Sequence, residues 1–252
     1  KRRLTHGLMV GLHETFISGD SIWVASTAID AALKYRIDDG SLEASHWPRE
    51  MPELQQSLQL EPLDIDKDID NRSNFLEQKT YRGSSHLHLN AICEFRGEMY
   101  ALFHSKNVVV NLRTGAIVIR DPNLKHAHNL IIEEPGVVWI NDTYRPVIRQ
   151  YDLNSGQEIR SINVRKMRGI NRLLLRSASM AIKEMGVSFF GSKRKATARP
   201  LFLRGLAINE EFIFAGFSPA TIVRIEKRTG KLIDSYFHSN DMRVCIHGLT
   251  CG

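Results

Sequence analysis

The chain has 252 residues, of which 42% are hydrophobic and 25% charged, a composition that excludes a disordered or fibrous protein. Its three cysteines, an odd number spaced widely at positions 93, 245 and 251, exclude a disulfide framework and a zinc module of paired cysteines. No apolar run approaches the ~20 residues of a membrane span, and the first residues lack the apolar core of a secretion signal. We therefore expect a cytoplasmic protein that does not enter a membrane.

Four stretches of the chain repeat one pattern of three short apolar strands that end in a glycine turn. They cover residues 12–40, 88–115, 128–156 and 204–230. Short β-branched and aromatic runs separated by glycine and aspartate turns are typical of β-hairpins. The second and third closing glycines, at 115 and 156, are 41 residues apart, the size of one four-stranded propeller blade. The repeats therefore predict an all-β fold, a β-propeller.

The number of blades follows from the other glycine intervals and from the end of the chain. The remaining intervals are 75 and 74 residues long, and Ile246–Leu249 has the pattern of a fifth repeat start. We expect about five blades in a single domain over residues 1–252, and six or seven blades also fit. Closure of the blades into a ring would remove free sheet edges.

Two segments with opposite charge account for the long intervals. Residues 41–84 carry nine acids and five bases, whereas residues 157–200 carry eleven bases and two acids. Each is predicted to be an insertion or a degenerate blade. Apolar residues recur at helical spacing over 166–185, which predicts an inserted amphipathic helix. The basic run has no interleaved aromatic residues for base stacking, so nucleic acid is an unlikely partner.

Six of the ten histidines fall where the repeats begin: His13, His86, His88, His126, His128 and His247. The first strand of each propeller blade lines the central channel, so equivalent positions converge. His13, His88, His128 and His247 are therefore candidate ligands of a divalent metal, zinc or iron. A metal-free polar pocket and purely structural histidines are the alternatives. Alignment of Asn90 with Asn129 places Leu89, not His88, opposite His128, and only a β-bulge would correct this register.

Other polar residues near the same positions complete the predicted site. Asn90 and Asn129 are candidate ligand-binding residues, and Glu14 is a candidate proton carrier beside the catalytic candidates His88 and His128. Arg204 starts the fourth repeat, where its guanidinium can hold a carboxylate or phosphate with two parallel hydrogen bonds. An ion pair between Arg204 and an acid such as Glu14 is the alternative.

Four short motifs in order resemble an uncharacterised family of bacterial proteins expected to be β-propellers. They are His88-Leu89-Asn90, Lys125-His126-Ala127-His128, Leu203-Arg204-Gly205-Leu206-Ala207 and Phe214-Ala215-Gly216-Phe217-Ser218. The resemblance spans about residues 85–250 and implies the fold, but no chemistry. The chain departs from the family in the third repeat, where the family has one histidine followed by serine.

These observations predict a propeller that binds a small polar or anionic ligand at a histidine-rich channel. If a metal is bound, the expected chemistry is that of a metal-dependent lyase or hydrolase. The alternative is a non-catalytic propeller that serves as a scaffold for a protein partner, because the same fold supports both roles.

Overall fold

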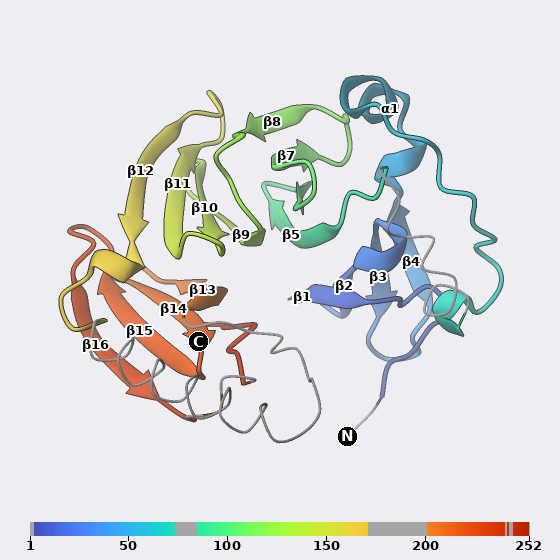
Figure 1. Cartoon of the computed structure of the whole chain (residues 1–252). Helices are drawn as coiled ribbons and strands as arrows, with labels where there is room; N and C mark the ends of the chain where they lie inside the picture. Colours follow the sequence, from blue (N-terminus) through green and yellow to red (C-terminus); the bar gives the residue numbers. More distant parts are fainter. Residues whose placement is uncertain (1–2, 74–84, 171–200, 240, 242–243, 252) are drawn as a thin grey trace, which may run out of the picture. The chain divides into compact units, whose positions relative to one another are not determined.

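The computed structural model describes residues 3–73, 85–170, 201–239, 241 and 244–251. Sixteen strands in these residues form four four-stranded sheets (Figure 1). The first two sheets contain β1 (Leu12–Ser18), β2 (Ser21–Ser26), β3 (Ala31–Arg36) and β4 (Leu42–His46), and then β5 (Leu89–Phe95), β6 (Glu98–Phe103), β7 (Val108–Asn111) and β8 (Ile117–Arg120). The other two contain β9 (Ala127–Glu133), β10 (Val137–Asp142), β11 (Val147–Asp152) and β12 (Glu158–Asn163), and then β13 (Phe202–Ile208), β14 (Phe212–Ser218), β15 (Thr221–Glu226) and β16 (Leu232–Phe237).

Each sheet is a meander in which every strand pairs with the next strand of the chain. The pairings within the first, second and fourth sheets are antiparallel. This is the strand order of a propeller blade. Gly40, Gly115, Gly156 and Gly230 all have positive φ in the turns before the fourth strands, which explains why glycine closes each repeat. The predicted all-β fold is confirmed.

The predicted count of about five blades is wrong, because the described residues form four. The apparent fifth start, Ile246–Leu249, contains no strand. Its side chains instead pack on the fourth sheet, where the side chains of Ile246 and Leu249 lie against Gly205 of β13. The first strand of a blade pairs with the second, and no strand follows β16 in the described residues to supply that partner.

The packing of Ile246 explains why position 216 is a glycine, and from it we predict the effect of a substitution on stability. A Cβ at Gly216 would collide with both Cβ and Cγ2 of Ile246. Gly216→Ala is therefore expected to lower the free energy of unfolding by about 1–3 kcal/mol, the usual range for overpacking. Urea denaturation measures the change. Gly248→Ala is the control, because a Cβ there meets no atom within 4 Å, and an equal loss in both variants would contradict the proposed collision.

The chain divides into two compact units. The first contains residues 1–138 and 151–157, and the second contains residues 139–150 and 158–252. In the first unit, helix α1 (Pro52–Leu58) packs Leu54 and Leu58 into an apolar core with Trp23 and Phe103. The 3-10 helices in the described residues are η1 (Thr27–Ile29), η2 (Pro48–Glu50) and η4 (Val164–Lys166).

The residues predicted as charged insertions begin with ordinary blade strands. Leu42–His46 forms β4, and Glu158–Asn163 forms β12. The predicted helix over 166–185 lies outside the described residues from 171 onward. The single-domain organisation and the nature of the remaining inserted residues stay predictions. Among the described helices, none is long and apolar enough to cross a membrane.

Buried polar side chains tie neighbouring blades together within each unit. In the first unit, the Thr27 hydroxyl donates to the Leu89 carbonyl oxygen at 2.6 Å. In the second unit, the Thr143 hydroxyl donates to the Leu203 carbonyl oxygen at the same distance, 2.6 Å. Both threonines directly follow the second strand of a blade, and both acceptors belong to the first strand of the next blade. The same hydrogen bond between blades therefore recurs along the chain, together with the strand pattern.

Candidate functional site

The first strands of three blades meet in the first unit, where β5 contacts both β1 and β9. Two of these strands carry β-bulges at the positions predicted to be functional. The bulge in β1 leaves His13 and Glu14 opposite a single residue of β2, and the bulge in β5 falls at Asn90. Bulges redirect side chains away from the regular pleat and are frequent beside active sites. The alignment of the repeats called for a β-bulge, and β1 and β5 each contain one.

Six histidines of the first unit form a continuous group of rings, which we call the imidazole cluster: His13, His86, His88, His104, His126 and His128. His88 is at its centre, with ring centroids 4.8 Å from His13, 5.4 Å from His86 and 4.7 Å from His104. His104 in turn lies 4.8 Å from His126 and 5.6 Å from His128. The structure thus brings together the predicted site residues His13, His88 and His128.

Hydrogen bonds identify the protonated ring nitrogen of His13 and of His128. Nδ1 of His128 lies 2.8 Å from the carbonyl oxygen of His126, so this nitrogen carries the proton. Nδ1 of His13 lies 2.8 Å from the Thr27 hydroxyl, whose own proton goes to Leu89. Thr27 must therefore accept from His13. In both neutral rings the lone pair is on Nε2, as in most metal-binding histidines.

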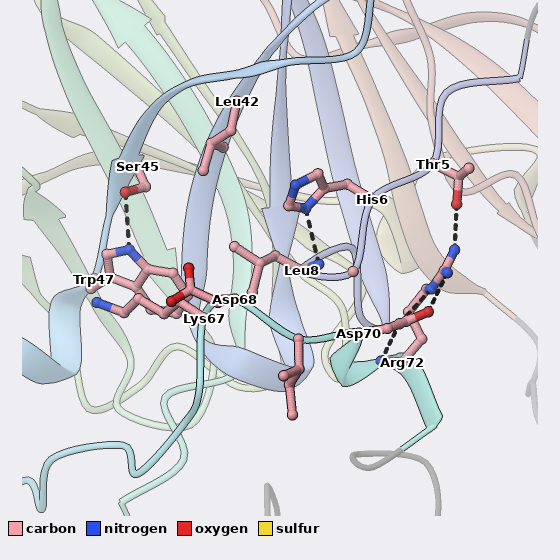
Figure 2. A pocket seen from close by; sticks show the side chains of 12 residues that line it. Thr5, His6, Leu8, Leu42, Ser45, Trp47, Lys67, Asp68, Asp70 and Arg72 are labelled. Atoms are coloured by element: carbon pink, nitrogen blue, oxygen red, sulfur yellow. Dashed lines mark hydrogen bonds and ion pairs between the residues drawn. The ribbon is translucent and has the colours of Figure 1, made fainter.

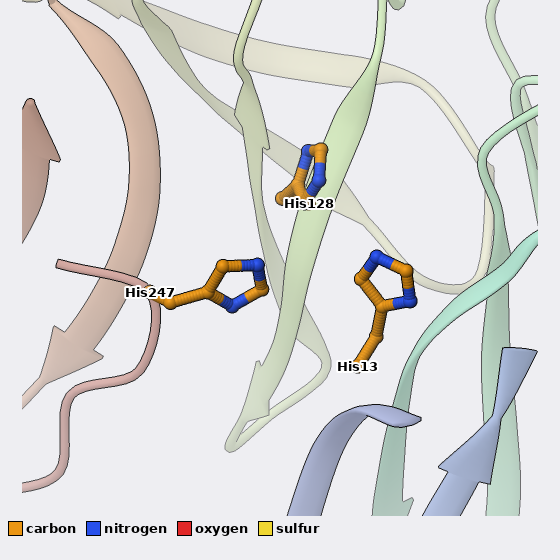
Figure 3. Close-up of side chains that lie close together, drawn as sticks. All are labelled: His13, His128 and His247. Carbon is orange, nitrogen blue, oxygen red and sulfur yellow. The ribbon is translucent and has the colours of Figure 1, made fainter. Parts of the chain in front are cut away.

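His13 and His128 lie near each other, so that a side-chain rotation could let them share a metal ion (Figure 3). A ring nitrogen of His13 lies within 4.8 Å of one of His128. Two nitrogens bound to the same zinc ion are at most about 4 Å apart, so a small side-chain rotation would bring both into coordination. His128 is almost completely buried, with 3% of its surface exposed, which protects such a site from competing water.

Glu14 is the most strongly perturbed acid near the cluster. Its Oε1 accepts a hydrogen bond of 3.3 Å from the Asn129 side-chain amide. Its Oε2 is buried and has no hydrogen-bond partner among the described residues. Burial raises the pKa of Glu14 to about 8, although the hydrogen bonds from Asn129 and the Ile92 backbone oppose the shift. The carboxyl group is therefore protonated at neutral pH and can donate a proton.

Asn90 and Asn129 make contacts between strands. The Asn90 amide donates to the Ala127 carbonyl oxygen at 2.6 Å, and its Oδ1 is buried without a partner among the described residues. Asn129 has a φ of 58°, a left-handed conformation that asparagine tolerates better than most residues. The ligand-binding role of both residues stays a prediction.

Asp30 and His104 belong to this region but were absent from the sequence prediction. Asp30 has 1% of its surface exposed, and its carboxylate accepts hydrogen bonds from the Leu87 and Leu89 backbones at 2.9 and 3.3 Å. It also lies 3.5 Å from Nε2 of His86. An acid in the otherwise apolar run 28–33 is the signal that would have found Asp30. His104 follows β6 just as Thr27 follows β2, so the repeat itself marks its position.

The second unit holds the remaining predicted residues, Arg204 and His247. Arg204 lies at a bulge in β13, with its guanidinium 5.0 Å from the centre of the Phe202 ring. Burial lowers the pKa of Arg204. Burial also lowers the pKa of His247, and the nearby positive charge of Arg204 lowers it further. His247 is therefore biased toward the neutral form that binds metals. The anion-binding role of Arg204 and the metal-binding role of His247 stay predictions.

A pocket of about 560 Å³ in the first unit shares no residue with the imidazole cluster (Figure 2). Its cationic side chains are already engaged within the protein. Lys67 lies 4.3 Å above the Trp47 ring and forms an ion pair with Glu50, and Arg72 forms an ion pair with Asp70. Its lysine and its arginine are thus both paired with acids, so this pocket does not explain the predicted anion binding.

Comparisons with known proteins provide evidence for the fold. No protein-family model matches the chain, and no curated protein matches it in sequence. Similar solved structures include a catalytically inactive virginiamycin B lyase from Staphylococcus aureus with quinupristin, at 11% identity and a TM-score of 0.50. The match covers 94% of this chain and 58% of that protein. A selenomethionine-substituted virginiamycin B lyase from the same organism matches at 10% identity and a TM-score of 0.48, over 91% of this chain and 56% of that one.

The computationally designed protein Ika8 is also similar, at 9% identity and a TM-score of 0.49, over 96% of this chain and 52% of that protein. The chain thus spans little more than half the length of these structures. At such low identity the likeness concerns the fold alone, and membership of the uncharacterised bacterial family stays a prediction. The chain is similar in fold to β-propellers.

Proposed function

We propose that the first unit binds a divalent transition metal through His13 and His128 and acts on a small polar or anionic ligand. The supporting observation is that ring nitrogens of the two histidines lie within 4.8 Å of each other, while Nδ1 of each ring is held by a protein oxygen. Imidazole nitrogens favour zinc and iron over magnesium or calcium, so zinc and iron are the proposed ions.

The proposed activity is that of a metal-dependent lyase or hydrolase. A bound metal ion would polarise an oxygen of the ligand. The protonated Glu14 carboxyl would donate a proton to a leaving group, because a pKa of about 8 keeps that proton available at neutral pH. Asn129 would hold the carboxyl through its hydrogen bond to Oε1. The remaining imidazoles of the cluster would accept and release protons around the ligand.

Metal titration of protein purified without a histidine tag tests the proposal. We expect about one equivalent of zinc or iron to bind. The double variant His13→Ala with His128→Ala is expected to weaken metal binding at least about tenfold, because changes around a metal site typically lower its affinity by that much. His238→Ala is the control, because His238 stacks on Tyr236 in the second unit. Binding that is absent, or unchanged in the double variant, would refute the metal site and favour the scaffold for a protein partner.

A further inference from the structure

The second unit contains a pocket with a strong excess of positive charge, which we call the basic pocket. It has a volume of about 640 Å³ and lies between β12, the residues that follow it, and the turn between β15 and β16. Four cationic side chains line it: Arg160, Lys166, Arg168 and Lys231. None of its described lining residues is acidic. Its size is within the range of pockets that enclose small molecules.

These four cations have no ion-pair partners among the described residues. This distinguishes the basic pocket from the pocket of the first unit, where Arg72 and Lys67 are paired with acids. Placing like charges around a concavity raises the local positive potential, because the low-dielectric walls focus the field. The arrangement costs folding free energy unless an anion offsets the repulsion.

Arg160 is held in position by the backbone. Its Nη1 and Nη2 donate to the carbonyl oxygens of Arg228 and Lys227 at 2.8 and 2.6 Å, which fixes the guanidinium against the turn before β16. Its Nε is buried and has no acceptor among the described residues. Carbonyl oxygens are neutral acceptors, so they hold the guanidinium of Arg160 in place without neutralising its charge. The side chain is therefore preorganised to bind an anion.

We propose that the basic pocket binds a small soluble molecule that carries two or more phosphate groups. Four cations exceed what one carboxylate would balance, and the Ser161 and Thr229 side chains add polar groups to the lining. Ile162, Met167 and Leu232 give the same pocket an apolar part that suits the organic body of such a ligand. No aromatic side chain is among its described lining residues, so it lacks the stacking surface of a site for single-stranded nucleic acid.

Calorimetric titration with pyrophosphate, the simplest probe of this class, tests the proposal at about physiological salt, where distant charges are screened. Lys166→Gln combined with Lys231→Gln is expected to weaken binding about tenfold or more, because each lysine supplies a charge-assisted contact. The matched control combines Arg165→Gln with Arg228→Gln, which removes the same charge from adjacent residues that do not line the pocket. The control is expected to change affinity by less than about twofold.

Other outcomes would overturn the proposal. Absence of pyrophosphate binding would refute the site. Equal losses in the two double variants would show that binding reflects only the general positive charge of this surface. Tighter binding of a single-stranded oligonucleotide, or of vesicles that contain phosphatidylinositol phosphates, would assign the pocket to a macromolecule or membrane surface instead. Thermal unfolding of all variants confirms that they are folded. Metal binding at His13 and His128 is a separate measurement, so the two proposals fail independently.

Discussion

Glu14→Gln is expected to make the protein more stable than the wild type at alkaline pH, by roughly 5 kcal/mol. The folded protein holds the pKa of Glu14 at about 8, against 4.5 for the unperturbed group. The folded state therefore binds more protons than the unfolded state between these values, and wild-type stability falls as pH rises through that window. Glutamine is neutral at every pH and keeps an oxygen that can accept from Asn129.

Urea denaturation in the presence of a chelator, at pH 5 to 9, measures this effect as a difference between variant and wild type. Titrations of other groups are common to both proteins and cancel in the difference. Glu43→Gln is the control, because Glu43 accepts a hydrogen bond from Ser21 that lowers its pKa. A difference for Glu14→Gln that stays flat from pH 5 to 8 would mean that the carboxyl group is ionised.

Asp30→Ala is expected to destabilise the protein by about 2–5 kcal/mol, because an unsatisfied buried donor costs roughly 1–3 kcal/mol and this substitution leaves two. Burial raises the pKa of Asp30, so the hydrogen bonds rather than a full negative charge carry this expectation. The substitution leaves the buried backbone N–H groups of Leu87 and Leu89 without their acceptor. It also removes the carboxylate beside His86. Chemical denaturation at neutral pH measures the loss.

A second variant at position 30 separates the loss of the carboxylate from the effect of the unusual backbone conformation. Asp30 has a φ of 50°, which alanine adopts poorly and asparagine tolerates. Asp30→Asn is therefore expected to keep part of the stability, since its amide oxygen can still accept from one backbone N–H. Asp38→Ala, at an exposed acid paired with Arg36, should change little. A loss as small for Asp30→Ala as for Asp38→Ala would rule out the buried network.

The blade strands were predictable because their signals are local. Alternating β-branched and aromatic residues define the strands, and the glycines of positive φ end each repeat, as at Gly115 and Gly156. The number of blades was not predictable in this way. Ile246–Leu249 has the residue pattern of a first strand, but only the three-dimensional structure shows that Ile246 fills the space left by Gly205 and Gly216.

The candidate site was predicted in part, and the reason lies in the backbone. His13, His88 and His128 were found because each lies near the start of the first strand of its blade. The bulge at Asn90 and the positive φ of His88 and Asn129 depend on contacts between blades, which one strand's sequence does not show. Asp30 was missed for a related reason: its partners, Leu87 and Leu89, are almost sixty residues away.

The bulges at the starts of β1, β5 and β13 also affect how such a chain can evolve. A one-residue slip in a regular strand would turn every side chain to the opposite face. His13, Glu14, Asn90 and Arg204 occupy bulged positions, outside the regular strand pairing. Substitutions at these four positions can therefore change the side chains presented there while the paired residues keep the register. Descendants of one ancestral chain can share these blades and still present different side chains at the starts of their inner strands.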